Sequence, residues 1–224
     1  MQIYEIEIKT LLGEKEHADL LIKKMQDNDI NCKCVAESSQ LNHYFEGGSI
    51  EDLYEAVKKM FTGDALARLK TITEKGSTFS VRTRQKDDKV LLVIKASLDG
   101  GTSENTVSRL EFEELVDISL AELDEIVLSA GFEYQAKWSR DRQEYQYKDV
   151  NVCIDKNAGY GYLAEFETVT EDENKAVQAK EKLIKLMSEL GVEELDQDRL
   201  ARMFEHYNAN WSEYYGTDKT FTVK

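Results

Sequence analysis

The charged residues of this chain alternate with apolar residues along several short segments, and this alternation constrains the fold more than any other feature. Glu5, Glu7 and Lys9 occupy every second position near the start of the sequence, with isoleucines between them. Side chains two residues apart lie on the same face of a β-strand. Residues 2–11 are therefore predicted to form a strand with one charged face and one apolar face.

The same pattern recurs in later segments, where the polar positions are almost all arginine, lysine or glutamate. An exposed sheet face usually mixes these residues with serine, threonine and glutamine, and an exposed ion pair stabilises a protein by only about 0–1 kcal/mol. The pattern therefore favours a closed antiparallel barrel with a charged lumen over an ordinary half-solvated sheet with its charges outward. The segments are 79–85 with Arg82 and Arg84, 90–97 with Lys95, 107–116 with Arg109, Glu111 and Glu113, 133–147 with Arg140 and Arg142, 150–155 with Asp155, and 162–169 with Glu165 and Glu167.

Apolar residues recur at helical spacing between the strands, and a barrel with an apolar outer face needs such helices as a cover. Ser119 and Glu122 form a capping box that starts one of them. No linker divides the chain, so we interpret it as one domain over residues 1–224, with a helical insertion at 49–75 and a helical C-terminal extension at 170–224. Helices are predicted at 17–26, 65–73, 119–131, 172–190 and 196–208, with a further one starting at Ser49, and another strand is predicted at 39–46.

The composition argues against several classes of protein. The net charge is −15, from 44 acidic and 29 basic residues, whereas proteins that bind duplex nucleic acid carry a basic face. No apolar run approaches the roughly 18 residues that a membrane helix needs, so no membrane partner is expected. The first residues lack the pattern of a signal peptide, and the cysteines are Cys32, Cys34 and Cys153. An odd number of cysteines without a secretion signal indicates reduced thiols and a cytoplasmic location.

A surface that carries basic and acidic residues together suits one kind of ligand. Arginine and lysine bind polyanions such as a triphosphate, and arginine does so with paired contacts. Clustered carboxylates bind Mg²⁺ or Mn²⁺, which often bridge to phosphate oxygens. Acids alone would repel a triphosphate and bases alone would not hold the metal, so the combination favours a metal–triphosphate complex.

The charged motifs follow one another in a specific order. The order is E-x-E-x-K at Glu5 to Lys9, R-x-R at Arg82 to Arg84, L-x-x-K at Leu92 to Lys95, R-x-E-x-E at Arg109 to Glu113, R-x-R-x-x-aromatic at Arg140 to Tyr145, then Asp155, Gly161 and Glu165-Phe166-Glu167. From about residue 2 to residue 169 this order resembles the CYTH family, also called triphosphate tunnel metalloenzymes. The segment from Leu41 to Phe45 resembles the family's second strand, whose tyrosine, here Tyr44, is catalytic in some members.

The resemblance implies an α+β fold, with an eight-stranded antiparallel tunnel that binds a triphosphate and a divalent metal ion. By resemblance, the catalytic residues would be Lys9 and Tyr44. The residues that bind the substrate would be Lys9, Arg82, Arg84, Lys95, Arg109, Arg140 and Arg142. The residues that hold Mg²⁺ or Mn²⁺ would be Glu5, Glu7, Glu111, Glu113, Asp155, Glu165 and Glu167.

Three functions remain open under this resemblance. The preferred one is a metal-dependent hydrolase whose substrate is inorganic triphosphate, a nucleoside triphosphate or thiamine triphosphate. The second is a class IV adenylyl cyclase that converts ATP to cyclic AMP and pyrophosphate, although the His-Phe dipeptide that usually precedes the first glutamate of such cyclases is absent. The third is a non-catalytic nucleotide or polyphosphate sensor. In each case we expect a triphosphate-containing small molecule as the partner, and a monomer or a homodimer.

Overall fold

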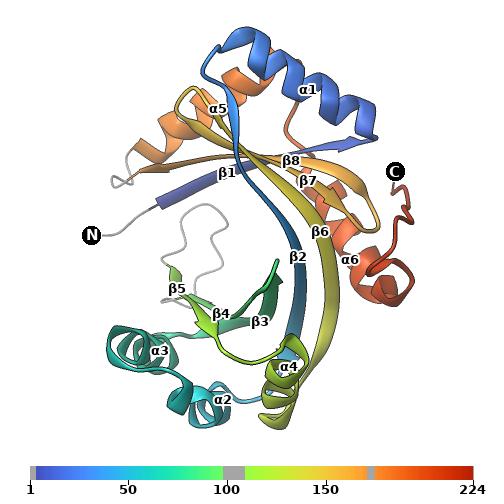
Figure 1. Cartoon of the computed structure of the whole chain (residues 1–224). Helices are drawn as coiled ribbons and strands as arrows, with labels where there is room; N and C mark the ends of the chain where they lie inside the picture. Colours follow the sequence, from blue (N-terminus) through green and yellow to red (C-terminus); the bar gives the residue numbers. More distant parts are fainter. Residues whose placement is uncertain (1–3, 98–108, 171–174, 224) are drawn as a thin grey trace. The chain divides into compact units, whose positions relative to one another are not determined.

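The computed structural model describes residues 4–97, 109–170 and 175–223, and its strands form a single sheet (Figure 1). The strands are β1 (Tyr4–Gly13), β2 (Lys33–Gly47), β3 (Thr78–Lys86), β4 (Lys89–Ser97), β5 (Arg109–Val116), β6 (Phe132–Tyr147), β7 (Val150–Asn157) and β8 (Gly161–Thr170). The eight strands follow the order β1-β8-β7-β6-β2-β3-β4-β5, and neighbouring strands run antiparallel. The predicted α+β class and eight-stranded antiparallel sheet are confirmed. Within the described residues, no backbone ladder joins β1 to β5, so hydrogen bonds do not close the sheet.

Helices lie between groups of strands and after the last strand, as the amphipathic segments predict. They are α1 (Lys15–Asn28), α2 (Ile50–Val57), the 3₁₀ helix η1 (Lys58–Met60), α3 (Gly63–Lys75), α4 (Leu120–Ser129), α5 (Ala176–Leu190) and α6 (Gln197–Tyr214). The predicted capping box is present at the start of α4, because Ser119 and Glu122 each accept a hydrogen bond from the other's backbone N–H. Among the described helices, none has the length and hydropathy needed to cross a membrane.

The chain divides into two compact units, each with its own hydrophobic core. Unit 1 comprises Met1–Ser39 and Ser139–Lys224, and unit 2 comprises Gln40–Trp138. The boundaries lie within the long strands β2 and β6, so each of these strands contributes residues to both units. The interpretation of residues 1–224 as one domain stays a prediction.

In unit 1, the helices α1 and α5 cover the apolar face of β1 and β8 (Figure 1). Ile8 of β1 and Phe166 of β8 face one another across the ladder and are buried beneath these helices. Leu21 of α1 and Leu183 of α5 are buried in the same core. Full burial of one such side chain contributes about 1.5–3 kcal/mol. The charged positions between the apolar ones are left on the opposite face, as the alternation predicts.

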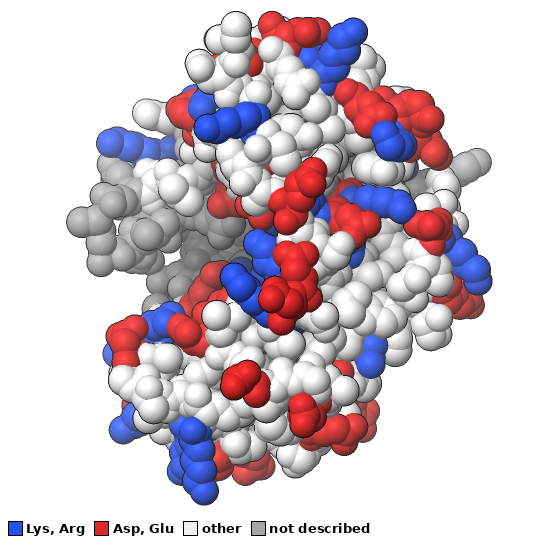
Figure 2. Space-filling view, viewed as in Figure 1, with Lys and Arg blue, Asp and Glu red and all other residues white. Residues whose placement is uncertain are grey.

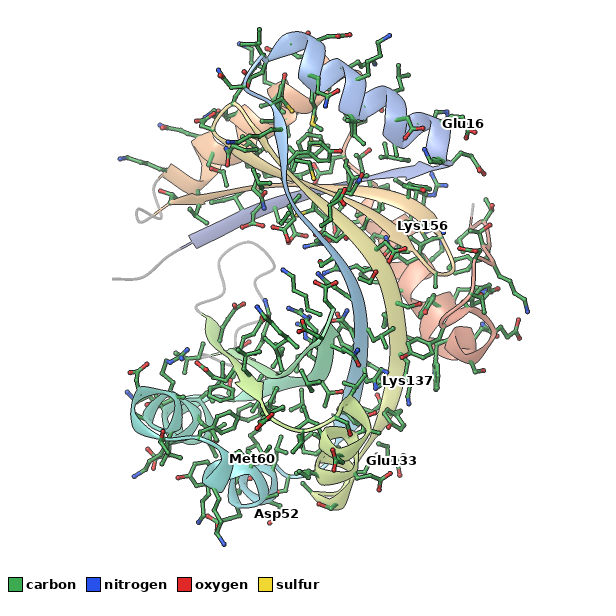
Figure 3. The ribbon with its side chains drawn as sticks, viewed as in Figure 1. Glu16, Asp52, Met60, Glu133, Lys137 and Lys156 are labelled. Atoms are coloured by element: carbon green, nitrogen blue, oxygen red, sulfur yellow. The ribbon has the colours of Figure 1, made fainter. Side chains whose placement is uncertain are left out.

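In unit 2, α3 and α4 cover β3, β4 and β5, and α2 packs on α3 and α4. Side chains project from both faces of these strands (Figure 3). Val81, Ile94 and Phe112 face one another across β3, β4 and β5, and all three are buried in the core. The neighbouring positions, which include Arg82, point to the face without helices.

Two elements extend well beyond their predicted limits, each by six residues at one end. The predicted strand begins at residue 39, whereas β2 begins at Lys33. The earlier start could not be predicted, because the first residues of β2 are mostly exposed and show no apolar alternation. The predicted last helix ends at residue 208, whereas α6 continues to Tyr214 after a kink at Asn210, where φ is −129°. The Asn210 side chain donates a hydrogen bond to the His206 carbonyl oxygen at 2.8 Å, which satisfies a backbone acceptor at the kink.

Gly161→Ala, in unit 1, is expected to destabilise the chain more than Gly63→Ala, in unit 2. Both glycines have positive φ, 73° and 56°, so alanine is strained at each, by about 1–2 kcal/mol. A Cβ at Gly161 would also clash with the backbone oxygen of Gly13, where β1 meets β8, whereas nothing lies within 4 Å of a Cβ at Gly63. Urea unfolding should show at least a twofold larger loss for Gly161→Ala, and equal losses would contradict the described junction.

Candidate functional site

One face of the unit 1 sheet carries charged residues that lie opposite one another on neighbouring strands. Lys9 on β1 lies opposite Glu165 on β8, which in turn lies opposite Cys153 on β7. Two residues before Lys9 on β1, Glu7 lies opposite Glu167 on β8. Facing residues of antiparallel strands project to the same side, with Cβ atoms about 4.5–5.5 Å apart. The backbone register therefore places acids and bases from separate parts of the sequence on one surface.

Asp155 is the most deeply buried acid of this face, with a side chain only 1% exposed. Arg140 donates to it through Nη1 at 2.8 Å, and Arg142 donates through Nε at 2.7 Å and Nη2 at 2.6 Å. Burial lowers the pKa of Arg142, but its hydrogen bonds and attraction to Asp155 and Glu165 outweigh that effect and raise the pKa above its ordinary value. Arg142 therefore stays charged, and its paired hydrogen bonds to Asp155 hold β6 and β7 together.

Glu165 connects the Asp155 cluster to β1. Arg142 forms a second ion pair with Glu165, and Lys9 Nζ lies 3.5 Å from Glu165 Oε1 and also contacts Glu7. Burial raises the pKa of Glu165, but the positive charges of Lys9, Arg142 and Arg140 lower it by more, so its pKa lies below the ordinary value. The carboxylate is thus held ionised among three cations.

Arg82 and Tyr44 form a contact on the uncovered face of unit 2. The two residues lie opposite each other on β3 and β2. Arg82 Nη1 donates to the Tyr44 hydroxyl at 3.1 Å, and its guanidinium carbon lies 4.8 Å from the centre of the tyrosine ring. Trp138 packs edge-on against the same ring, with centroids 6.4 Å apart. The Nε of Arg82 is buried and has no hydrogen-bond partner in the described part of the chain.

The other charged residues of this face are paired. Arg84 donates through Nε to Asn42 Oδ1 at 2.7 Å and through Nη1 to Glu113 at 2.8 Å. Lys95 forms an ion pair with Glu111. The sequence motifs do not single out Asn42, although its parity with Tyr44 on β2 is a signal that could have found it.

The structure brings the predicted site residues together within each unit. Glu7, Lys9, Arg140, Arg142, Asp155, Glu165 and Glu167 are in unit 1, and Tyr44, Arg82, Arg84, Lys95, Glu111 and Glu113 are in unit 2. Two predicted residues are described only by their backbone: Glu5 lies opposite Val169 on the β1–β8 ladder, and Arg109 lies opposite Ser97 on the β4–β5 ladder. Their side chains lie outside the described part of the structure.

The described carboxylates of unit 1 offer an ion such as Mg²⁺ a pair of ligands rather than a complete set. In the described residues, no group of three histidine, cysteine, aspartate or glutamate side chains is close enough to hold a metal ion together. Glu7 and Glu167 nevertheless lie opposite each other. Mg²⁺ is usually bound by one or two carboxylates, with waters and substrate phosphates as its remaining ligands. Such a pair of oxygen donors therefore fits an ion that arrives with a phosphate.

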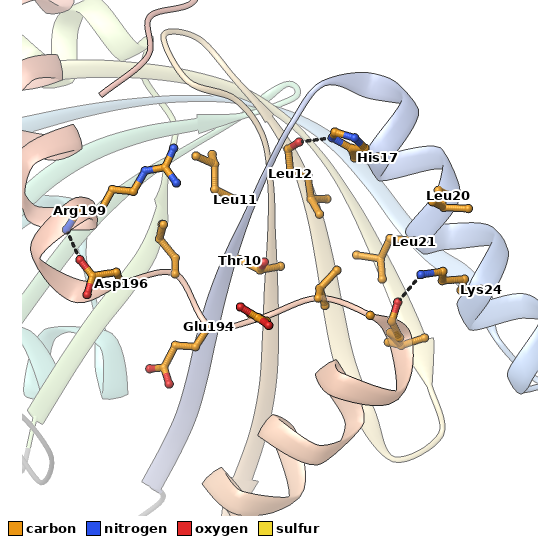
Figure 4. Close-up of a pocket in the computed structure, with 15 residues that line it drawn as sticks. Thr10, Leu11, Leu12, His17, Leu20, Leu21, Lys24, Glu194, Asp196 and Arg199 are labelled. Carbon is orange, nitrogen blue, oxygen red and sulfur yellow. Dashed lines mark hydrogen bonds between the residues drawn. The ribbon is translucent and has the colours of Figure 1, made fainter. Parts of the chain in front are cut away.

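A hollow of about 480 Å³ lies elsewhere in unit 1, between α1, β1 and the segment that joins α5 to α6 (Figure 4). Lys24 crosses it to donate to the Leu190 carbonyl oxygen at 2.7 Å, and the Leu195 backbone N–H donates to the Lys9 carbonyl oxygen at 2.7 Å. Leucines make up much of its lining, which contains both acids and bases but none of the predicted site residues. The hollow therefore lies where the C-terminal segment packs on β1, and we do not interpret it as a second charged site.

Acidic and basic side chains are interspersed over the surface (Figure 2). On the face shown, the described residues form no extended basic patch. This distribution agrees with the net charge of −15.

A sequence model of the CYTH domain matches residues 71–201, which is more than half of the 224-residue chain. The match contains the motifs from Arg82 to Glu167, but it does not contain Tyr44 or the motif from Glu5 to Lys9. It also continues beyond residue 169, where the recognisable motifs end. No protein with a curated description matches the chain.

Solved structures share the fold at low sequence identity. The PH1819 protein of Pyrococcus horikoshii is 20% identical with a TM-score of 0.59, over 91% of this chain and 99% of that one. A candidate adenylate cyclase of Vibrio parahaemolyticus is 13% identical with a TM-score of 0.58, over 92% and 99%. The Hippeastrum protein HpAC1, a candidate adenylyl cyclase described as having a dominant triphosphatase activity, is 18% identical with a TM-score of 0.51, over 91% and 96%. At these identities the likeness shows the fold alone.

Arg142→Ala is expected to lower the free energy of unfolding by about 3–5 kcal/mol, because it removes two of the three hydrogen bonds to the buried Asp155 and leaves Arg140 as its one described cation. Lys156→Ala is the control, since it breaks the exposed pair with Asp218 and should cost less than about 1 kcal/mol. Arg142→Lys keeps the charge and should fall between the two. Urea unfolding of the three variants measures the difference, and similar losses for Arg142→Ala and Lys156→Ala would contradict the Asp155 cluster.

Proposed function

The chain belongs to the CYTH family, and on that basis we propose that it is a metal-dependent hydrolase of a triphosphate-containing substrate. The observation that carries the proposal is the buried Nε of Arg82, which lacks a partner among the described residues. A buried polar group without a hydrogen bond is costly, and a guanidinium nitrogen is satisfied by an anion. A phosphate oxygen at this position would remove the cost.

The proposed substrate ligands are the basic residues of the uncovered faces. Arginine suits phosphate because its planar guanidinium can make two parallel hydrogen bonds to one phosphoryl group. Arg84 and Arg142 are held in fixed orientations by Asn42 and Asp155, so they lose little conformational entropy when a phosphate binds. The full proposed set is Lys9, Arg82, Arg84, Lys95, Arg109, Arg140 and Arg142.

The proposed metal ligands are the carboxylates of the same faces. Glu7 and Glu167 are the pair that the register places opposite each other. Asp155 accepts three hydrogen bonds from arginines, so binding of a metal by Asp155 requires some of these bonds to be exchanged. A bound Mg²⁺ or Mn²⁺ would stabilise charge on the phosphoryl oxygens and lower the pKa of a bound water. The full proposed set is Glu5, Glu7, Glu111, Glu113, Asp155, Glu165 and Glu167.

The proposed catalytic residues are Lys9 and Tyr44. The Tyr44 hydroxyl accepts its hydrogen bond from Arg82, so its own proton is free to be donated to a phosphate oxygen. The Lys9 ammonium lies beside Glu7 and Glu165 and is positioned to stabilise negative charge on a leaving group. Phosphoryl transfer depends mainly on such positioning and electrostatic stabilisation.

The products decide between the remaining functions. The chain is incubated with inorganic triphosphate, ATP or thiamine triphosphate and with Mg²⁺ or Mn²⁺, and phosphate, pyrophosphate and cyclic AMP are measured. We expect phosphate release and little cyclic AMP, in line with the dominant triphosphatase activity described for the Hippeastrum protein. Stoichiometric cyclic AMP and pyrophosphate would instead identify an adenylyl cyclase, and binding without any product would identify a sensor.

Arg82→Ala is expected to lower kcat/KM for the hydrolysed triphosphate by about 100-fold, because it removes a charge-assisted contact that a phosphate would make in a desolvated site. Arg68→Ala is the matched control in the same unit, since Arg68 is exposed on α3 and pairs with Asp64 and Glu114. It should change kcat/KM by less than twofold. Equal effects of the two substitutions would remove the role proposed for Arg82.

Glu165→Gln is expected to reduce metal-dependent hydrolysis by at least 100-fold while the chain still folds, because the amide keeps the volume but removes the charge. Glu189→Gln on α5 is the control, since Glu189 is exposed and contacts only Lys148 among the described cations. Removal of divalent metal with EDTA should have the same effect on the unaltered chain. Full activity of Glu165→Gln, or activity in EDTA, would refute the metal assignment.

A further inference from the structure

Asp124 places a buried carboxylate between α4 and the strands β2 and β3. Its side chain is 6% exposed and accepts hydrogen bonds from His43 Nδ1 at 2.7 Å, Thr83 Oγ1 at 2.6 Å and the Tyr134 hydroxyl at 2.7 Å. Lys137 Nζ lies 4.0 Å from the same carboxylate. Figure 3 labels Lys137 on β6, beside α4. Because an ionised carboxylate only accepts hydrogen bonds, His43 donates through Nδ1.

The carboxylate is held ionised by these donors. Burial raises the pKa of Asp124, but the hydrogen bonds from His43, Thr83 and Tyr134 lower it by more, so the pKa lies below its ordinary value. Leu123 and Val127 fill the same helix face with apolar side chains. A buried charge is costly compared with an apolar residue of similar size, so core packing alone does not account for an aspartate here.

The position of the Asp124 contacts connects them to the proposed phosphate ligands. His43 and Thr83 face each other on the β2–β3 ladder. The next facing pairs on either side are Tyr44 with Arg82 and Asn42 with Arg84, and their side chains project to the opposite face of the sheet. Asp124 therefore binds both strands at the one facing pair that lies between the two arginines.

Both arginines depend on β2 for their orientation. Arg84 Nε donates to Asn42, and Arg82 donates to Tyr44, so each guanidinium is anchored on the neighbouring strand. The position of each guanidinium therefore depends on the alignment of β2 with β3, and that of Arg84 depends also on Glu113 of β5. The hydrogen bonds of Asp124 to His43 and Thr83 join the two strands from the covered face, in addition to their backbone ladder.

We propose that Asp124 is a positioning residue, which holds β2 and β3 in alignment through His43 and Thr83 and thereby orients Arg82 and Arg84 toward a triphosphate. Its effect on substrate rests on the proposed function. Its effect on the two arginines is independent of that function, so the two can be tested separately.

The test compares Asp124→Asn and Thr83→Val with Val127→Ala. Asp124→Asn presents an amide to three donors, and Thr83→Val removes one of the hydrogen bonds with little change of volume. Val127 is fully buried one helical turn after Asp124, so Val127→Ala loosens the same helix without touching the carboxylate. Thr83→Val keeps the experiment informative if Asp124→Asn does not fold.

The first measurement is the ¹H–¹⁵N signals of the arginine Nε–Hε groups, assigned with Arg82→Lys and Arg84→Lys. We expect Asp124→Asn and Thr83→Val to shift the Arg82 and Arg84 signals and to speed exchange of the Arg84 proton with water. Val127→Ala should leave both signals in place. Unchanged signals in Asp124→Asn and Thr83→Val, or equal shifts in all three variants, would overturn the positioning role.

The second measurement is the Kd of inorganic triphosphate with Mg²⁺, by isothermal titration. We expect the Kd to rise at least tenfold in Asp124→Asn and Thr83→Val and to stay within twofold in Val127→Ala. If the unaltered chain binds no triphosphate, the proposed function is wrong, whereas the arginine signals still decide the role of Asp124. A Kd unchanged by Asp124→Asn in a chain that binds triphosphate would overturn the effect on substrate.

Discussion

Charges that share a sheet face can be removed from water only when each is bound by an opposite charge or a hydrogen-bond partner, and the structure depends on this constraint. Asp155 is the clearest case, since its buried carboxylate accepts three hydrogen bonds from Arg140 and Arg142. Without them its burial would cost several kcal/mol. Because the charges satisfy one another on this face, the other face of the same strands can be largely apolar and can be covered by helices.

The same constraint distinguishes Arg82 from the other arginines of the uncovered faces whose side chains the structure describes. Arg84 and Arg142 each bind a carboxylate, whereas the described contacts of Arg82 are with an aromatic hydroxyl and ring. An arginine held by neutral groups keeps its full charge available. Paired arginines are thus suited to fix geometry, and Arg82 is suited to attract an anion.

The two-residue period of the sequence predicts the fold and the charged faces, because strand geometry fixes which side chains share a face. Lys9 and Glu165 on one side, and Ile8 and Phe166 on the other, could be assigned in this way without coordinates. Pairing across strands could not, because it depends on register, as with Arg142 and Asp155. Asn42 has the parity of Tyr44, so it could be assigned to the charged face of β2. Asp124 lies on the apolar face of its helix, and a polar residue in an apolar register is the signal that points to it.

The segment that follows α5 covers part of the edge of β1. β1 is an end strand of the sheet, and an end strand offers unpaired backbone groups with which another molecule can pair. The Leu195 N–H occupies the Lys9 carbonyl oxygen on this strand, and α5 packs beside it. The C-terminal segment therefore occupies part of this edge and makes it less available for pairing with another chain, at the strand that begins the family's motif order.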